Sequence, residues 1–200
     1  MSSEIYQQLM QQALAASTAD DSAMAIRLWT EASCCEPPSA TPHLLLGAEH
    51  AQLGQIEDAE AAFANAILLS PTLLIARFQL GLLQFTSGRV GIAMLTWQPL
   101  LQAAPDGSLS LFVEGFAALA QDKFEEAIAN FETGIARNVD NAPLNTDMRM
   151  VIERTIALMA AGESDEATVK IPQAESLTPS EDRSEEHILL ANYQQYGLPH

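Results

Sequence analysis

Histidine and cysteine are the residue types in this chain of 200 residues that are best suited to metal binding or catalysis. His43 and His50 are seven positions apart, which on a helix is about 10.5 Å of rise. Both therefore cannot reach one metal ion at bond lengths of about 2.0–2.1 Å. Cys34 and Cys35 are adjacent, and the chain has no further cysteine to supply ligands or a disulfide framework. We expect the two histidines to occupy packing positions and the two cysteines to be small buried hydrophobic residues.

The paired acidic residues and the glycines are also not arranged in any known catalytic or nucleotide-binding motif. Glu57-Asp58 and Glu125-Glu126 stand where helices are expected to begin, and carboxylates there interact favourably with the helix dipole. The sequence contains no P-loop, no dinucleotide-binding fingerprint and no serine elbow. No nucleophile is paired with a base at a spacing that indicates covalent catalysis. The sequence therefore predicts no enzyme, no cofactor and no metal site.

A repeat of 34 residues organises most of the chain. Small residues, aromatic residues, turn residues and prolines each recur with this period. They are Ala13, Gly47, Gly81 and Gly115; Trp29, Phe63, Trp97 and Phe131; Asp20, Gly54, Gly88 and Asp122; and Pro37, Pro71 and Pro105. Each period predicts a helical hairpin, because glycine or aspartate can adopt the left-handed turn and proline ends the second helix. The small residues allow two helices to approach, and the aromatic residue is expected to fill the space between one hairpin and the next.

The pattern resembles the tetratricopeptide repeat family. That family has Leu-Gly near the middle of the first helix, an alanine and an aromatic residue on the second, and a proline near its end. The closest agreement is at Leu46-Gly47, Ala59, Phe63, Ala66 and Pro71. The resemblance implies an all-α, right-handed solenoid whose concave face binds a peptide or a helix.

Composition divides the chain into a solenoid and a tail. Hairpins are expected over residues 6–39, 40–73, 74–107 and 108–141, followed by a capping helix over 144–161. We expect residues 162–180 to form an acidic linker. Residues 181–196 read as a short C-terminal helix.

Charge limits the classes of partner. The chain has 9 basic and 26 acidic residues, a formal net charge of −17. This charge argues against binding to nucleic acid or to an anionic membrane, and no apolar stretch is long enough to span a bilayer. The start of the chain lacks the features of a secretory signal, so we expect a cytoplasmic protein. An acidic rim favours a basic, amphipathic partner, although surplus carboxylates also simply keep a repeat protein soluble.

The candidate partner-binding residues form an apolar stripe on the first helices of the hairpins. They are Leu44, Ile75, Phe78, Leu82, Phe85, Leu109, Phe112, Phe116 and Leu119. One interpretation is an exposed groove for a peptide or an amphipathic helix. A second is ordinary core, and a third is a groove covered by the chain's own helix 181–196.

The function that these observations favour is protein–protein interaction without catalysis, as an adaptor or scaffold. One alternative is a secretion or assembly chaperone that holds an apolar client segment. A weaker alternative is a regulatory module with an unrecognised ligand site.

Overall fold

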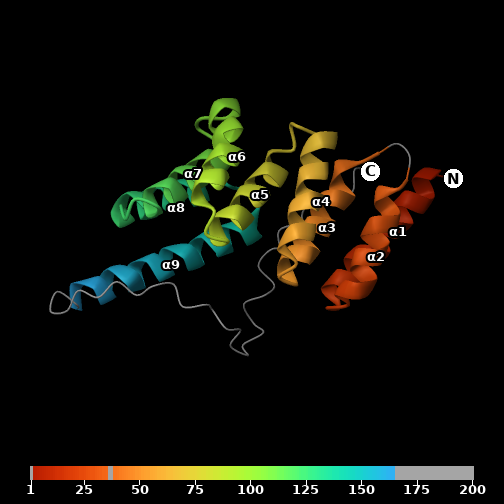
Figure 1. Cartoon of the computed structure of the whole chain (residues 1–200), viewed down its shortest axis with the longest axis horizontal. Helices are drawn as coiled ribbons and strands as arrows, with labels where there is room; N and C mark the ends of the chain where they lie inside the picture. Colours follow the sequence, from red (N-terminus) through yellow and green to blue (C-terminus); the bar gives the residue numbers. More distant parts are fainter. Residues whose placement is uncertain (1, 36–37, 165–200) are drawn as a thin grey trace.

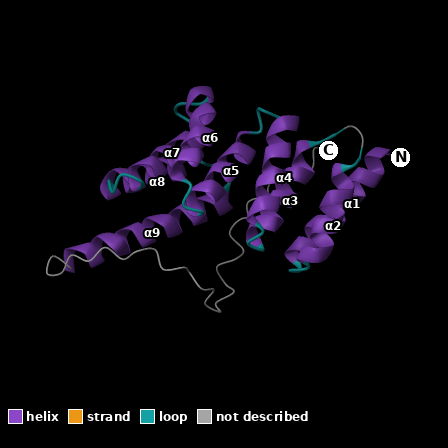
Figure 2. Cartoon of the chain, in the orientation of Figure 1, coloured by secondary structure: helices purple, strands orange, loops and turns teal. Residues whose placement is uncertain are grey.

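The computed structural model describes residues 2–35 and 38–164, and these residues form nine helices and no strand (Figures 1 and 2). Eight helices pair into four hairpins, and a ninth follows them. The helices are α1 (Ser2–Thr18), α2 (Ser22–Ser33), α3 (Ala40–Gln52), α4 (Ile56–Leu69), α5 (Leu74–Thr86), α6 (Val90–Ala103), α7 (Ser108–Leu119), α8 (Phe124–Arg137) and α9 (Ala142–Ser164). The predicted all-α solenoid of helical hairpins is thus confirmed for the described residues.

The helix bounds differ from the expected ranges mainly at the two ends of the solenoid. Helix α1 begins at Ser2 rather than at residue 6, and α9 begins at Ala142 rather than at residue 144. Helix α9 also continues to Ser164, so the first residues of the expected linker 162–180 are helical. The rest of that linker and the expected helix 181–196 lie outside the described residues.

The turn between the two helices of each hairpin has a left-handed backbone, as the repeat predicted. The φ angles are +59° at Asp20, +68° at Gly54, +76° at Gly88 and +56° at Asp122. Glycine adopts this conformation without steric cost, and aspartate is one of the few other residues that tolerate it. The period therefore encodes a backbone conformation at each hairpin turn.

The small residue in the middle of the first helix makes room for the aromatic residue of its own hairpin. A Cβ atom built on Gly47 would lie 2.6 Å from the Phe63 ring, far inside van der Waals contact. A Cβ atom on Gly81 would likewise overlap the indole of Trp97. The ring also reaches the next hairpin, because the centroids of Trp97 and Phe116 are 5.5 Å apart. The aromatic residue therefore packs within its own hairpin as well as between that hairpin and the next.

An aromatic cluster joins the third and fourth hairpins. The Phe78 ring lies 5.9 Å from Trp97, 6.1 Å from Phe112 and 6.5 Å from Phe116, measured between ring centroids. The indole Nε1 of Trp97 donates a hydrogen bond of 2.9 Å to the backbone oxygen of Phe78. Tilted and stacked pairs of this kind add about 0.5–1.5 kcal/mol each beyond their buried area. The cluster therefore fixes α5, α6 and α7 relative to one another.

Buried asparagines attach α9 to the fourth hairpin. The Asn138 side chain donates to Oδ1 of Asn145 at 2.8 Å, and the Asn145 amide donates back to the Asn138 carbonyl at 2.8 Å. The Asn141 side chain accepts from the backbone N–H of Leu144 at 3.0 Å, within the first turn of the helix. Leu144 and Met148, in the first two turns of α9, are buried in the core. The start of α9 is therefore held in a defined position, which matters because α9 supplies one wall of the site described below.

Glu49 is a buried carboxylate where the first and second hairpins meet. Both of its side-chain oxygens are buried and lack a hydrogen bond among the described residues. Burial raises the pKa of Glu49, and the polar groups of Ser17, Ser22 and Trp29 nearby offset only part of this effect. The folded state therefore holds a proton on Glu49 to higher pH than the unfolded chain does. Stability is lost as pH rises from the unfolded-state pKa through the folded-state pKa.

We expect Glu49→Gln to raise the free energy of unfolding at pH 8 by about 1 kcal/mol, because it removes a buried charge without hydrogen bonds. The gain should shrink towards zero at pH 4, where the wild-type carboxyl is mostly protonated in both the folded and the unfolded state. Urea unfolding at the two pH values measures the difference. The same change at Glu114, which is exposed, is the control and should have no such pH dependence. A Glu49→Gln variant no more stable than wild type at pH 8 would contradict this interpretation.

Candidate partner-binding groove

A groove opens between the middle of the solenoid and α9. It has a volume of about 350 Å³, and its walls come from α3, α4, α5, α7 and α9. In Figure 1, α9 runs along the lower side of the fourth hairpin, with its first turns towards α5. The lining residues are Ala51, Gln52, Phe63, Gln79, Leu82, Leu83, Thr86, Phe116, Asp147, Met148, Met150, Val151 and Arg154. We call this site the α5–α9 groove.

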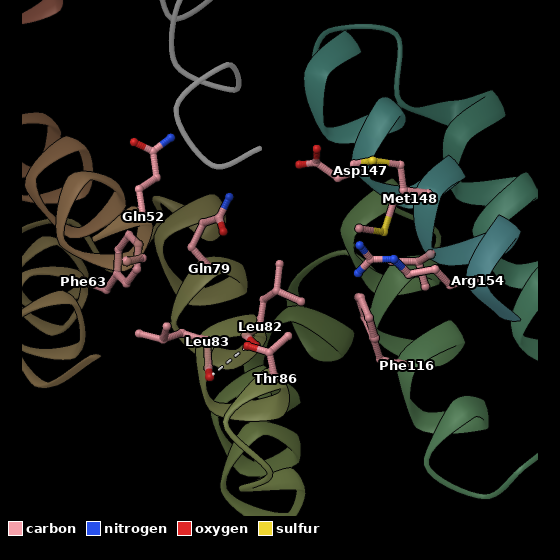
Figure 3. A pocket seen from close by; sticks show the side chains of 13 residues that line it. Gln52, Phe63, Gln79, Leu82, Leu83, Thr86, Phe116, Asp147, Met148 and Arg154 are labelled. Carbon is pink, nitrogen blue, oxygen red and sulfur yellow. Dashed lines mark hydrogen bonds between the residues drawn. The ribbon is translucent and has the colours of Figure 1, made fainter. Parts of the chain in front are cut away.

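Apolar side chains form most of the lining of the α5–α9 groove. Leu82 and Leu83 project from α5, Phe116 from α7 and Met148 from α9 (Figure 3). Val151 of α9 also lines the groove. Sites that bind apolar ligands or side chains typically combine such a lining with a few polar groups that fix orientation. The groove is therefore suited to hold an apolar side chain.

Polar groups stand at defined places in the same groove. The Thr86 hydroxyl is already used, since it donates to the backbone oxygens of Leu82 at 2.9 Å and Leu83 at 3.2 Å (Figure 3). Gln79 is 1% exposed, and neither atom of its amide has a hydrogen bond among the described residues. The Nε2 atom of Gln52 is buried and unpaired in the same sense. The groove therefore contains the Gln79 amide and the Gln52 amide nitrogen without hydrogen-bond partners among the described residues.

The structure corrects the expected exposure of the predicted apolar stripe. Five of its nine residues are buried in the core: Leu44, Ile75, Phe78, Phe112 and Phe116. The reason is that successive first helices and the second helix of each hairpin pack against this face. The Phe112 ring, for example, lies where a Cβ atom on Gly134 would be. For these five residues the interpretation as ordinary core is confirmed, and the interpretation as an open surface was wrong.

The other four residues of the stripe are half-buried: Leu82, Phe85, Leu109 and Leu119. The α5–α9 groove brings Leu82 and Phe116 together, and the remaining seven predicted residues do not line it. Leu109 instead lines a smaller cavity of about 170 Å³ where α6 meets α7. Binding of a partner by the stripe as a whole stays a prediction. Of its nine residues, only Leu82 and the edge of Phe116 are in a position to contact a partner in the groove.

Sequence reasoning missed the contribution of α9 and of Gln79. Residues 147, 148, 150, 151 and 154 all face the groove. Their spacing of three to four is that of one helical face, so the signal was present. That face was interpreted as a cap over the end of the stack rather than as a wall of a site. Gln79 carried no signal, because a glutamine in a helix is ordinarily exposed.

The described residues hold no group of three or more histidine, cysteine, aspartate or glutamate side chains arranged to bind a metal ion. Burial lowers the pKa of His43, and Nδ1 of His50 lies 2.6 Å from Oε1 of Gln55. Cys34 is exposed and Cys35 is half-buried, both with free thiols, so the expectation of two buried cysteines was wrong.

Among the helices described, none combines the length and the apolar character that crossing a bilayer requires.

No protein-family model and no curated protein matches the chain. Solved structures do match. A fragment of MamA from Desulfovibrio magneticus RS-1, beginning at its residue 41, superposes with a TM-score of 0.55 at 14% identity over 82% of this chain and 98% of that chain. A crystal structure of MamA protein gives a TM-score of 0.55 at 16% identity over 85% of this chain and 100% of that chain. At these identities the similarity shows the fold, a tetratricopeptide-like helical-hairpin solenoid.

Proposed function

We propose that the chain is a non-catalytic protein-interaction module, an adaptor or scaffold, which holds an apolar side chain of a partner peptide or helix in the α5–α9 groove. The observation that carries the proposal is the groove itself, with its volume of about 350 Å³ and its largely apolar lining. Grooves of this size and composition are where proteins bind ligands and partner side chains. The helical-hairpin fold supports the proposal, because such solenoids present extended surfaces of this kind.

The charge of the chain supports a basic partner. The formal net charge is −17, so the surrounding field attracts cations and speeds their encounter with the groove. Basic residues flanking the apolar side chain of the partner would therefore increase the association rate more than they would slow dissociation. That rate should fall steeply as salt concentration rises, because the Debye length is about 10 Å at 0.1 M salt.

We expect Leu82→Asp to abolish selection of binding peptides from a displayed library of random sequences. The substitution places a charge on the apolar lining of the α5–α9 groove. An apolar side chain that enters the groove would have to strip water from this charge. For a peptide selected on wild type, affinity should fall at least tenfold. The readout is fluorescence anisotropy of that peptide.

The matched control for this substitution is Leu95→Asp. Leu95 lies on α6 of the same hairpin, is 72% exposed and does not line the groove. It should bind the selected peptide like wild type, and circular dichroism should show both variants folded. A selected peptide that binds Leu82→Asp unchanged, or that is lost on Leu95→Asp, would contradict the proposed site.

Further measurements separate the alternatives. A single client that stays in solution only when bound to this chain would favour the chaperone interpretation over an adaptor. Docking of the predicted helix 181–196 in the groove would make a chain ending at residue 164 bind the selected peptide more tightly, and equal affinity would exclude such docking. The regulatory alternative would require a small-molecule ligand that competes with the peptide. The cytoplasmic location stays a prediction.

A further inference from the structure

Within the part of the chain that the structure describes, Gln79 is a buried amide without a hydrogen bond, in a groove whose lining is mostly apolar. Its amide carries one acceptor oxygen and one donor nitrogen, both are buried, and neither has a partner among the described residues. Leaving such a group unpaired costs about 1–3 kcal/mol. Figure 3 shows the Gln79 side chain among the residues that line the α5–α9 groove, between Gln52 on one side and Asp147 on the other. The last torsion of glutamine is soft, so the amide can turn towards whatever enters the groove.

The chemistry of Gln79 restricts what that occupant is. To satisfy the amide, it must offer a donor and an acceptor close together and bring them into an apolar environment. One residue of an extended chain does this, because its backbone N–H and C=O are free and its side chain projects away from them. An α-helix does not, because its backbone groups are already paired within the helix. A second unpaired amide nitrogen, on Gln52, offers a further donor for the same chain.

We propose that Gln79, with Gln52 beside it, hydrogen-bonds the main chain of an extended peptide segment whose apolar side chain enters the groove against Leu82, Phe116 and Met148. The occupant is therefore an extended segment and not a helix. This inference rests on the proposed function and decides between the two kinds of partner that it leaves open. It also explains why a buried glutamine stands among leucine, phenylalanine and methionine side chains.

Three small uncharged probes test the proposal on the full chain by NMR titration. N-acetyl-leucine N-methylamide carries the side chain and a complete backbone unit. Its ester analogue, O-acetyl-2-hydroxy-4-methylpentanoic acid N-methylamide, has an oxygen in place of the leucine N–H and so lacks that donor. Benzene is apolar. We expect the amide to bind wild type at least tenfold more tightly than the ester and to shift the side-chain NH₂ resonances of Gln79 and Gln52. In Gln79→Leu the preference for the amide should vanish, whereas benzene should still bind because the apolar lining is kept. Gln98→Leu, at an exposed position on α6, is the control and should keep the preference.

The outcomes distinguish failure of the proposed function from failure of the inference about Gln79. If neither benzene nor the leucine amide binds wild type, the proposed function fails and this inference fails with it. If benzene binds but the amide and the ester bind equally, or if Gln79→Leu keeps the preference for the amide, this inference alone is overturned. A leucine carried on a lactam-bridged helix that binds wild type more tightly than the capped leucine would also overturn it. Thermal unfolding of Gln79→Leu checks that the variant is folded, and it should melt no lower than wild type because the substitution removes an unpaired buried amide.

Discussion

Replacing Phe78 by aspartate is expected to unfold the chain. The Phe78 side chain is 0% exposed and lies at the centre of the aromatic cluster formed with Trp97, Phe112 and Phe116. Removing a buried phenylalanine ring costs about 3–5 kcal/mol, and burying a carboxylate in its place costs several more. The sum is comparable with the whole stability of an ordinary domain, about 5–15 kcal/mol. Circular dichroism should show most of the helical signal lost at 25 °C.

Leu95→Asp is the control for Phe78→Asp because it makes the same change of charge on the exposed face of α6. Its free energy of unfolding should stay within about 0.5 kcal/mol of wild type. The contrast between the two variants tests whether Phe78 belongs to the core, as the structure shows, rather than to an open surface, as the sequence predicted. A Phe78→Asp chain that unfolds with the wild-type midpoint would show that the ring contributes little to the core.

Gly81→Ala is expected to lower the free energy of unfolding by about 2 kcal/mol. The new methyl group would overlap the Trp97 indole, and that indole is 0% exposed, so it can give way only by displacing its core neighbours. Overpacking a tight core costs about 1–3 kcal/mol. Moving the indole also weakens the 2.9 Å hydrogen bond from its Nε1 to the Phe78 carbonyl, a loss of about 1 kcal/mol. The higher helix propensity of alanine offsets less than 1 kcal/mol of this loss in the free energy of unfolding.

Gly91→Ala separates the clash from the helix propensity. Gly91 lies in the first turn of α6, and a Cβ atom there would meet nothing within 4 Å. We expect this variant to be about 0.5 kcal/mol more stable than wild type, since alanine favours the helix. Urea denaturation of both variants measures the two effects. If Gly81→Ala were as stable as Gly91→Ala, the glycine of the repeat would not be needed to seat the aromatic ring.

The fold could be predicted from the sequence because it is encoded locally and repeatedly. Gly54 and Gly88 mark turns, Gly47 and Gly81 leave room for rings, and each feature recurs 34 residues later. Contacts between neighbouring hairpins follow once the hairpins form, since each stacks on the next. Periodicity alone is sufficient for such a fold.

The site could not be predicted to the same degree because it depends on how separate elements are oriented. Phe78 and Phe112 stand 34 residues apart on the first helices of their hairpins, but their burial depends on the angle between successive hairpins. Met148 and Val151 enter the groove because the asparagines at the start of α9 fix its direction. Nothing in the local sequence distinguishes Gln79, which is buried, from an exposed glutamine in a helix.

The most direct test of the central claim is an NMR measurement of where a peptide selected on the wild-type chain makes contact. With methyl groups labelled, intermolecular NOEs from the apolar side chain of the peptide should reach Leu82, Met148 and Val151, which line the α5–α9 groove. NOEs to the exposed Leu68 and Leu95, with none to those three groove residues, would place the partner elsewhere and contradict the assignment of the groove as the binding site.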